Sequence, residues 1–423
     1  MKPSKRKDKT PLSSTPQSVD KSISKSQRLV YIFVLGFLFM VQTLVTDMFL
    51  PAHPLIATFF EVPDAFIQYS LSAVTLGAAI GFFVAGPLSD SMGRKKPVLL
   101  ALGLFTFASA ALYVAPGIEA FVFLRFLQGL AGAATAVIAQ AIIRDLFVGN
   151  AMLKMLSRAW LISGLAPIVS PIIAAQLMLV APDWRIIPLA LAILGAAILV
   201  FASRALVETL HKDNRRAKGF EGVAKRFVAV FKDRILVGLV LIGMVQTVGL
   251  FSYLNIIPFL YQDSLGLTPV EFSLAFSTTA FCWFLGIQVG AKLGRMFKAH
   301  WVVLGALVLA VVAGGGLYLI GSMDVGIETV VPLMAMFLVS FGVTITPIQT
   351  IALQGHGSEA GTAASVLGVM NAATAALTAP LYPMIGSATT TGIGITVVLT
   401  HLAAIGVFFF VVRPSSVPAL IKE

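Results

Sequence analysis

The apolar segments of this sequence contain two ionisable side chains at places where charge is costly. Asp47 follows eighteen uncharged residues, 29–46, and Arg125 lies inside another apolar stretch, with Gln128 one helical turn further on. A charge at the centre of a bilayer costs about 2.5–3.5 kcal/mol on insertion scales, and such residues tend to mark paths for ions or substrates. Asp47, Arg125 and Gln128 are therefore candidate proton-coupling residues.

Asp47 offers proton chemistry if water can reach its carboxylate. Desolvation favours the neutral acid and a nearby guanidinium favours the carboxylate, so a carboxyl group held between the two can bind and release a proton near neutral pH. Two other interpretations stay open. In the first, Asp47 only caps its helix or lies in interfacial water before Pro51. In the second, Arg125 extends its side chain to the membrane surface. His53 is expected in a loop and His401 as a packed polar group.

The elements that carry these residues must lie in a membrane. Hydrophobic residues make up 58% of the chain and charged residues 12%, with a mean hydropathy of +0.93; soluble domains have about 25% charged residues. A membrane-spanning helix needs about 20 mostly apolar residues. The sequence predicts an all-α integral membrane protein with about twelve such helices, at 29–50, 67–88, 97–115, 120–142, 157–180, 184–203, 235–258, 272–291, 301–321, 328–350, 361–384 and 389–412.

The distribution of Lys and Arg predicts how the helices are oriented. Of the 30 basic residues, 28 fall in the two tails and in alternate connections between the predicted helices, and the exceptions are Arg125 and Arg185. Because basic loops stay on the cytoplasmic side, both termini are predicted to be cytoplasmic. The net charge of +11 then reflects topology, and the sequence does not favour nucleic-acid binding.

A long charged stretch, Arg204–Arg234, divides the predicted helices into six and six. The predicted organisation is a disordered basic tail at 1–28, an N-terminal six-helix bundle at 29–204, a cytoplasmic linker at 205–233, a C-terminal six-helix bundle at 234–413 and a short tail at 414–423.

The two halves repeat each other weakly at an offset near 209 residues. The segment Asp47–Pro51 has a counterpart in Leu254–Pro258. Glycines spaced four residues apart, a spacing that lets helices approach closely, also recur. Together these matches favour a duplicated unit and two pseudo-symmetric bundles, an architecture typical of secondary transporters with a binding site between the halves. The glycine pairs are Gly77 with Gly81 and Gly286 with Gly290.

The stretch "GPLSDSMGRKKPVLL", residues 86–100, resembles the loop signature of the major facilitator superfamily. Asp90 and Arg94 are spaced to form a charge-assisted hydrogen bond, while Gly86 and Gly93 allow close backbone approach. The resemblance implies that this loop is a conformational latch that holds the two halves in the outward-facing state. In the second half the counterpart is reduced to "GAKLGRMF".

Three further stretches narrow the resemblance. "TDMFLPAHP" resembles the first-helix signature of Bcr/CflA-type drug exporters, and "LRFLQGLAGAA" is similar to the fourth-helix signature tied to proton coupling. "SGLAPIVSPIIAAQL" resembles the fifth-helix antiporter signature through Gly164, Pro167 and Pro171, although Ala174 and Ala175 replace the usual paired glycines. The resemblance implies a twelve-helix drug:proton antiporter of the kind involved in multidrug efflux and antibiotic resistance.

Polar residues in the second half are candidates for a substrate cavity. Many of them can equally well form ordinary interhelical hydrogen bonds. The candidates are Tyr253, Asn255, Gln246 and Asn371.

We therefore expect a proton-coupled secondary transporter in the plasma (inner) membrane that exports small amphipathic compounds by alternating access. Asp47 is the expected proton carrier and Arg125 its coupling partner. A proton-coupled importer of a small metabolite on the same fold is the alternative. The proton gradient supplies the energy, so neither a cofactor nor a metal is expected, and the chain is expected to be monomeric. An integral membrane enzyme is disfavoured because the sequence contains no "DDxxD", "HExxH" or "GxxxxGK[ST]" motif.

Overall fold

The computed structural model describes residues 25–147, 149–210, 215, 233–323, 325–354, 360–378 and 389–416. Within these residues the chain is helical, with no β-strand. Eleven of the described helices are long and apolar enough to cross a membrane, and a shorter apolar helix covers Val366–Ala376. The predicted all-α membrane fold is confirmed, whereas the side on which the termini lie stays a prediction.

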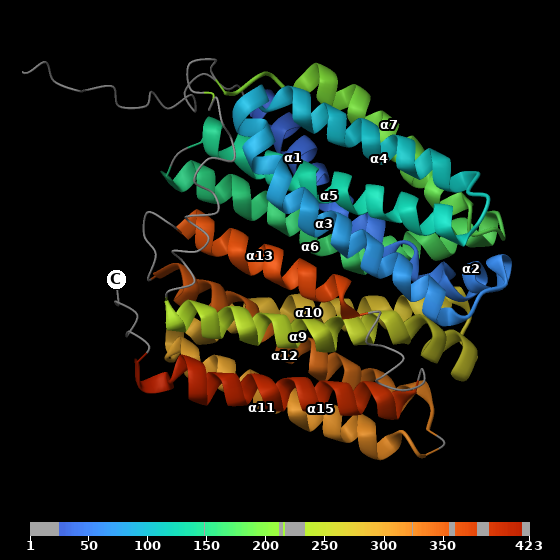
Figure 1. Ribbon diagram of the computed structural model, residues 1–423, viewed down its shortest axis with the longest axis vertical. Coiled ribbons are helices and arrows are strands. Elements are labelled where there is room, and N and C mark those ends of the chain that lie inside the picture. The colour runs from blue at the N-terminus through green and yellow to red at the C-terminus, as the bar shows by residue number, and fades with distance from the viewer. Residues whose placement is uncertain are drawn as a thin grey trace, which may run out of the picture.

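The first half forms one group of helices, the blue-to-green group in Figure 1. Its longest helices are close to 30 residues, enough to cross about 30 Å of hydrocarbon with length to spare. The elements are α1 Lys25–Asp47, η2 Leu50–Ala52, α2 His53–Phe60, α3 Asp64–Met92, α4 Lys95–Tyr113, α5 Ile118–Leu146, α6 Gly149–Val180 and α7 Ile186–Ala205.

The second half forms the yellow-to-red group in Figure 1. The predicted linker at 205–233, the tails at 1–28 and 414–423 and the end of the predicted helix at 361–384 lie wholly or partly outside the described residues. The elements are α9 Arg234–Phe259, η4 Leu260–Ser264, α10 Pro269–Met296, α11 Ala299–Ile320, α12 Ile327–Gln354, α13 Ala360–Ala376, α15 Thr390–Val407, η6 Phe408–Val412 and η7 Pro414–Ser416.

The two halves share one packing pattern. α3 packs along α5 in the first half as α10 packs along α12 in the second, and α4–α7 likewise matches α11–α15. A Cβ atom on Gly77 would collide with the backbone of α5, and one on Gly286 would collide with the backbone of α12. Glycines at these positions therefore permit the same close helix contact in each half.

The first predicted helix, 29–50, is wrong at its C-terminal end. α1 stops at Asp47, and the chain continues through the short 3-10 turn η2 into α2. Pro51 and Pro54 lack a backbone N–H, so the regular ladder of an α-helix cannot run through this segment. A similar irregularity follows Pro258, where α9 gives way to the π-helical turn η4.

The halves interlock where these two irregular segments meet. Leu50 of η2 lies in the hydrophobic core of the second half, and Phe259 of α9 lies in that of the first half. α2 and η2 both contact α9. We call this end of the molecule the His53 end, and the opposite end, where α3 meets α4, the Arg94 end.

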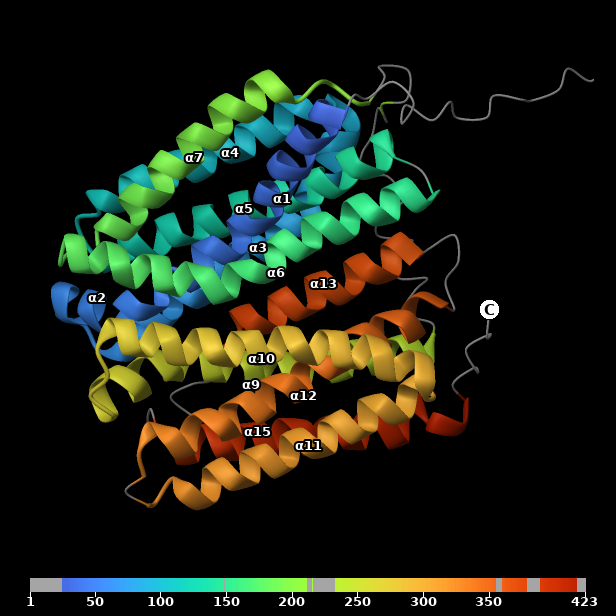
Figure 2. The same cartoon turned by 180° about the vertical axis from the view of Figure 1, so that it is seen from behind.

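Two helix pairs extend the contact between the halves, α3 with α13 and α6 with α10. Figures 1 and 2 both show α13 next to the first half. The Ser277 hydroxyl on α10 donates a hydrogen bond of 2.6 Å to the Ile168 carbonyl on α6. Because the repeat relates α3 to α10 and α6 to α13, the two inter-half contacts are equivalent under the same pseudo-symmetry.

Candidate functional site

Asp47 is the last residue of α1 and lies between the two halves. Its side chain is 6% exposed, and it interacts electrostatically with Tyr253 of α9, across the interface. Among the described residues no hydrogen bond or ion pair engages the carboxylate. The Asp47 carboxyl group is therefore buried without a counterion among the described residues.

Arg125 of α5 is fully buried, so the alternative that its side chain extends to the membrane surface is wrong. Its Nη1 donates hydrogen bonds to the Val45 carbonyl, at 2.6 Å, and to Gln128 Oε1, at 3.0 Å. The guanidinium carbon lies 4.0 Å from the centre of the Phe49 ring, a cation–π contact. Its Nε and Nη2 have no hydrogen-bond partner among the described residues.

The sequence led us to expect Arg125 to pair with Asp47, but the structure does not show this pair. Among the described residues no ion pair joins them. Because α1 ends at Asp47, the carbonyl groups of its last turn lack donors within the helix. Arg125 binds one of these carbonyls, that of Val45, in place of the carboxylate.

Gln128 connects Arg125 to a third helix. Its Nε2 donates a 2.8 Å hydrogen bond to the Ser109 hydroxyl on α4, which in turn donates to the Phe105 carbonyl at 2.7 Å. All of these side chains are buried. The network thus ties the end of α1 to α5 and α4. Ser109 was missed by sequence reasoning, because one serine in an apolar helix carries no signal.

His53 is not a loop residue as expected but the first residue of α2, and it is 1% exposed. Pro51 and Pro54 lie at the starts of η2 and α2, so this segment is helical and does not form an open loop. The imidazole stacks on Phe259 of the second half, with ring centres 6.3 Å apart and an interplanar angle of 27°. Neither ring nitrogen has a hydrogen-bond partner among the described residues.

His401 on α15 is packed in the membrane region, as expected. It is fully buried, and its Nδ1 lies 2.8 Å from the Val397 carbonyl of its own helix. This hydrogen bond satisfies one nitrogen and fixes the ring. His401 therefore contrasts with His53, which is equally buried but has neither nitrogen paired.

A charged group at the Arg94 end, which we call the Arg94 cluster, consists of Ser89, Asp90, Arg94, Asp145 and Glu208. Arg94 Nη1 donates to Asp90 Oδ1 at 2.6 Å and to the Ser89 hydroxyl at 2.8 Å, while Nε donates to Asp145 Oδ2 at 2.8 Å. Glu208 accepts hydrogen bonds from the backbone N–H of Arg94, at 2.8 Å, and from that of Lys95, at 3.3 Å.

The electrostatics of the Arg94 cluster follow from these contacts. Burial alone would lower the pKa of Arg94, but the hydrogen bonds and charges of Asp145 and Asp90 outweigh it and raise that pKa. Burial likewise favours a neutral Glu208, but backbone N–H donors and the charge of Arg215 lower its pKa overall. The cluster therefore favours the charged forms of Arg94 and Glu208.

The glycines of the loop signature do not contribute equally. Gly93 has a φ of +93°, a conformation that strongly favours glycine. Gly86 was expected to permit close backbone approach, but a Cβ there would lie 3.9 Å from its nearest neighbour, a Val137 methyl group. That expectation is wrong for Gly86, because the close contacts of α3 occur nearer its middle, at Gly77 and Gly81.

The loop signature in the sequence predicts the pair of Asp90 and Arg94, but the sequence gives little indication of the other members of the Arg94 cluster. Asp145 lies at the end of α5, at the same end of the bundle as Arg94, and this placement was a usable signal. Glu208 follows α7 beside a basic stretch, where nothing in the sequence sets it apart.

The residues of the fifth-helix signature lie within one helix. α6 runs through Pro167 and Pro171 without a break, and Gly164 faces Phe284 of α10, whose ring would lie 3.3 Å from an added Cβ. Gly164 thus belongs to the α6–α10 contact between the halves. The part of the three signature residues in transport stays a prediction.

Two of the four second-half candidates form interhelical hydrogen bonds. The Tyr253 hydroxyl lies 2.9 Å from the Thr279 hydroxyl on α10, and Gln246 Oε1 accepts from the Thr344 hydroxyl on α12 at 3.3 Å. Tyr253 and Gln246 thus form ordinary interhelical hydrogen bonds, the alternative that the sequence left open. Asn255 Oδ1 and Asn371 Oδ1 have no hydrogen-bond partner among the described residues.

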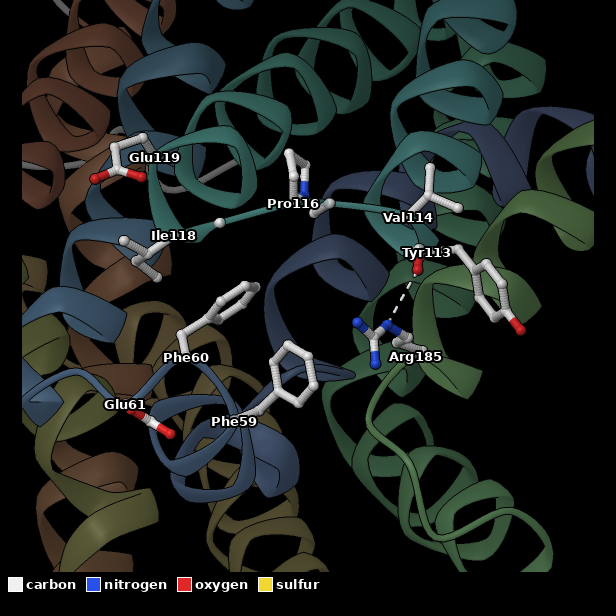
Figure 3. Close-up of a pocket in the computed structure, with 11 residues that line it drawn as sticks. Phe59, Phe60, Glu61, Tyr113, Val114, Pro116, Ile118, Glu119 and Arg185 are labelled. Carbon is white, nitrogen blue, oxygen red and sulfur yellow. Dashed lines mark hydrogen bonds between the residues drawn. The ribbon is translucent and has the colours of Figure 1, made fainter.

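A pocket of about 740 Å³ opens at the His53 end, within the first half. It lies between the end of α2, the α4–α5 connection and Arg185, with Phe59, Phe60 and Ile118 around it (Figure 3). Arg185 packs over the Phe59 ring at 4.2 Å and donates to the Tyr113 carbonyl at 3.2 Å. Neither Asp47 nor Arg125 lines this pocket, so it is separate from the buried acid and base.

Comparison with known proteins places these features in a family. Residues 35–380 match the model of the Major Facilitator Superfamily. The chain is 30% identical over 386 residues to the uncharacterized MFS-type transporter YdgK of Bacillus subtilis, covering 91% of this chain and 95% of the relative. It is 29% identical over 354 residues to the bicyclomycin resistance protein homolog of Haemophilus influenzae, covering 82% and 87%.

Among solved structures, the fold resembles a bacterial homologue of the human lysosomal transporter Spinster. The TM-score is 0.74 at 13% identity, and the match covers 92% of this chain and 98% of the other. At this identity the likeness concerns the fold alone.

Proposed function

Because the chain belongs to the Major Facilitator Superfamily, and so is a multi-pass membrane transporter and not an enzyme, we propose that it exports small amphipathic compounds in exchange for protons. A relative named as a bicyclomycin resistance protein homolog supports drug-like substrates. Asp47 is the proposed proton carrier. Export of a neutral compound by alternating access, driven by the proton gradient without a cofactor, is the activity that its position favours.

The observation that carries the proposal is the burial of Asp47 at the end of α1, just before the turn η2 that contacts α9 of the second half, and within electrostatic reach of Tyr253. When a proton neutralises the carboxylate, its interaction with the second half changes, which shifts the balance between two arrangements of the halves. One elementary charge crossing 100 mV provides about 2.3 kcal/mol, and each 1.4 kcal/mol is a tenfold ratio. A roughly fifty-fold gradient of a neutral compound is then within reach.

Arg125 acts in this scheme as a positioning residue. It binds the Val45 carbonyl two residues before Asp47 and is itself held by Gln128. Its coupling to Asp47 then runs through the last turn of α1 instead of through an ion pair. Movement of α5 against α1 changes where the carboxylate lies.

The Arg94 end faces the cytoplasm in this proposal, and the membrane is the plasma (inner) membrane. The Lys and Arg of the tails and alternate loops favour this orientation. The proposed latch is the Arg94 cluster, which fixes the α3–α4 loop at the end of a helix that packs on α13 of the other half. The chain is proposed to work as a monomer.

Everted membrane vesicles test both coupling and direction. Respiration acidifies their interior, and a pH-sensitive dye reports the gradient. For an exporter, adding a transported compound outside drives proton efflux and dissipates part of the gradient in wild type but not in Asp47→Asn. An importer that carries compound and proton together would instead deepen the gradient, and an unchanged gradient would rule out proton coupling.

The compounds for this assay come from growth tests. Cells with and without the expressed chain are exposed to a panel of antibiotics that includes bicyclomycin. Protection that requires Asp47 identifies a compound for the vesicles. No protection against any amphipathic compound would count against the proposed substrate class.

A further inference from the structure

His53 is a buried ionisable side chain in this region to which the proposed function assigns no part. It lies at the start of α2, buried, with its ring on Phe259 of the other half. Leu50 and Ala52 beside it are fully buried as well. The imidazole is therefore enclosed by the contact that interlocks the halves at the His53 end.

Burial opposes a proton on the His53 ring while that contact is made. Arg125 of α5 acts on it electrostatically, and neither ring nitrogen has an acceptor among the described residues. An imidazolium without a hydrogen-bond acceptor is costly away from water. Other titratable groups lie on the elements around it toward this end: Asp47 on α1, Tyr253 on α9, the buried Tyr261 and exposed Asp263 on η4, and the exposed Asp64 and Tyr69 on α3 and Glu119 on α5.

Separation of the halves would reverse this situation. Phe259 would leave the ring, water would reach both nitrogens, and the imidazole would return to the environment in which histidine titrates with a pKa of about 6.5. The protonation state of His53 is thus tied to whether η2 and α2 touch α9.

We propose that His53 is a second proton-binding site, which takes up a proton from water when the halves separate at the His53 end and releases it to the same water when they close. This inference rests on the proposed alternating access but not on Asp47 as the carrier. One N–H bond forms on opening and breaks on closing, and the proton comes from and returns to solvent. Acid at the His53 end then favours the open arrangement, in which that solvent also reaches Asp47.

Distances between spin labels measure the opening directly. The full-length chain, with Cys282→Ser, carries labels at Pro116→Cys and Ser264→Cys, which belong to the first and second halves at the His53 end. One proton taken up on opening raises the open-to-closed ratio by up to tenfold for each unit that the pH falls below about 6.5. We expect this rise in wild type and its loss in both His53→Asn and His53→Gln.

His401→Gln is the matched control, because His401 is equally buried but already hydrogen-bonded. It should keep the full pH dependence. The same pH dependence in His53→Asn or His53→Gln would overturn the proposal, as would its loss in His401→Gln with no change in the His53 variants.

A second readout does not depend on how the His53 variants fold. The chain has five histidines, and replacing the other four by glutamine leaves His53 as the only imidazole. Its nitrogen NMR signals should change from neutral ring to imidazolium over the pH range in which the label distance changes. A ring that stays neutral while the label distance changes, or becomes charged without such a change, would contradict the proposal.

Asp47→Asn separates this inference from the proposed carrier. We expect Asp47→Asn to lose proton-driven export and to keep the pH-dependent opening. Export that survives in Asp47→Asn would refute the carrier and leave His53 untouched. Opening that loses its pH dependence in Asp47→Asn would assign the titration to Asp47 and overturn the proposal for His53.

Discussion

The two halves of this transporter share a scaffold but not its chemistry. Aligning Pro51 with Pro258 sets Asp47 against Leu254. Aligning the contact of Gly77 with α5 on that of Gly286 with α12 sets Arg125 against Leu338, because the glycines meet Phe126 and Val339, the next residue in each case. Where the first half buries an acid and a base, the second half has two leucines.

This difference indicates a division of labour. The close helix contact at Gly77 recurs at Gly286, so the duplicated scaffold accommodates either the ionisable pair or the two leucines. In the proposed scheme the first half responds to protons through Asp47, whereas the second half, which has Leu254 and Leu338 at the equivalent positions, does not. The Arg94 cluster has the same asymmetry, since among the described residues Arg295 of the second half donates only to the Ala291 carbonyl of its own helix.

The largest difference in stability between the halves should follow from replacing the arginine of each loop signature. Arg94→Gln leaves Asp90 and Asp145 partly buried without their cation, and breaking such a pair costs about 3–5 kcal/mol. Arg295→Gln removes one exposed hydrogen bond within its own helix and should change stability by less than about 0.5 kcal/mol. Thermal unfolding of the purified proteins measures both, and similar losses would contradict the asymmetry.

Arg125 can be replaced by leucine, the residue at the equivalent position, 338, of the second half. Arg125→Leu removes the charged donor of the Val45 carbonyl, and such a hydrogen bond is worth about 1.5–3 kcal/mol. If that energy places Asp47 for transport, export should fall by roughly ten- to a hundredfold. Export is compared in vesicles with equal amounts of folded protein. Leu338→Met serves as the control and should keep export, and normal export by Arg125→Leu would remove Arg125 from the mechanism.

The shared scaffold should respond equally in the two halves. Gly77→Ala and Gly286→Ala each force a methyl group against a helix backbone, an overpacking that costs about 1–3 kcal/mol. Gly86→Ala and Gly294→Ala have room and should be near neutral, since their nearest neighbours would lie 3.9 and 3.7 Å from the new Cβ. Thermal unfolding of the four variants checks this, and a large loss in one half alone would break the equivalence.

The smallest effect concerns pH at the Arg94 cluster. Because the pKa of Glu208 is lowered in the folded protein, its contribution to stability is present above its unfolded value of about 4.3 and is lost as pH falls through the folded value. Wild type should therefore lose more stability than Glu208→Gln between pH 6 and pH 3. Parallel pH profiles of the two melting temperatures would show that Glu208 does not stabilise the folded state.

How far the sequence predicts the molecule depends on the range of the interactions. Long apolar segments are a local property, so the helices and the duplication followed from the sequence, and Asp90 and Arg94 are four residues apart on one turn. The partner of Arg125 was unpredictable, because it depends on which carbonyl the end of α1 leaves free. Phe259 against His53 was beyond prediction for the same reason, since 206 residues separate two side chains that only the docked halves bring together.

The central claim is that Asp47 carries the proton, and proteoliposomes with an acidic interior test it most directly. Asp47→Asn is compared with wild type and with Leu254→Asn, the same amide at the equivalent position of the other half. With a compound identified by the growth tests, wild type and Leu254→Asn should accumulate it against its gradient, whereas Asp47→Asn should only equilibrate it. Accumulation by Asp47→Asn at the wild-type level would contradict the account.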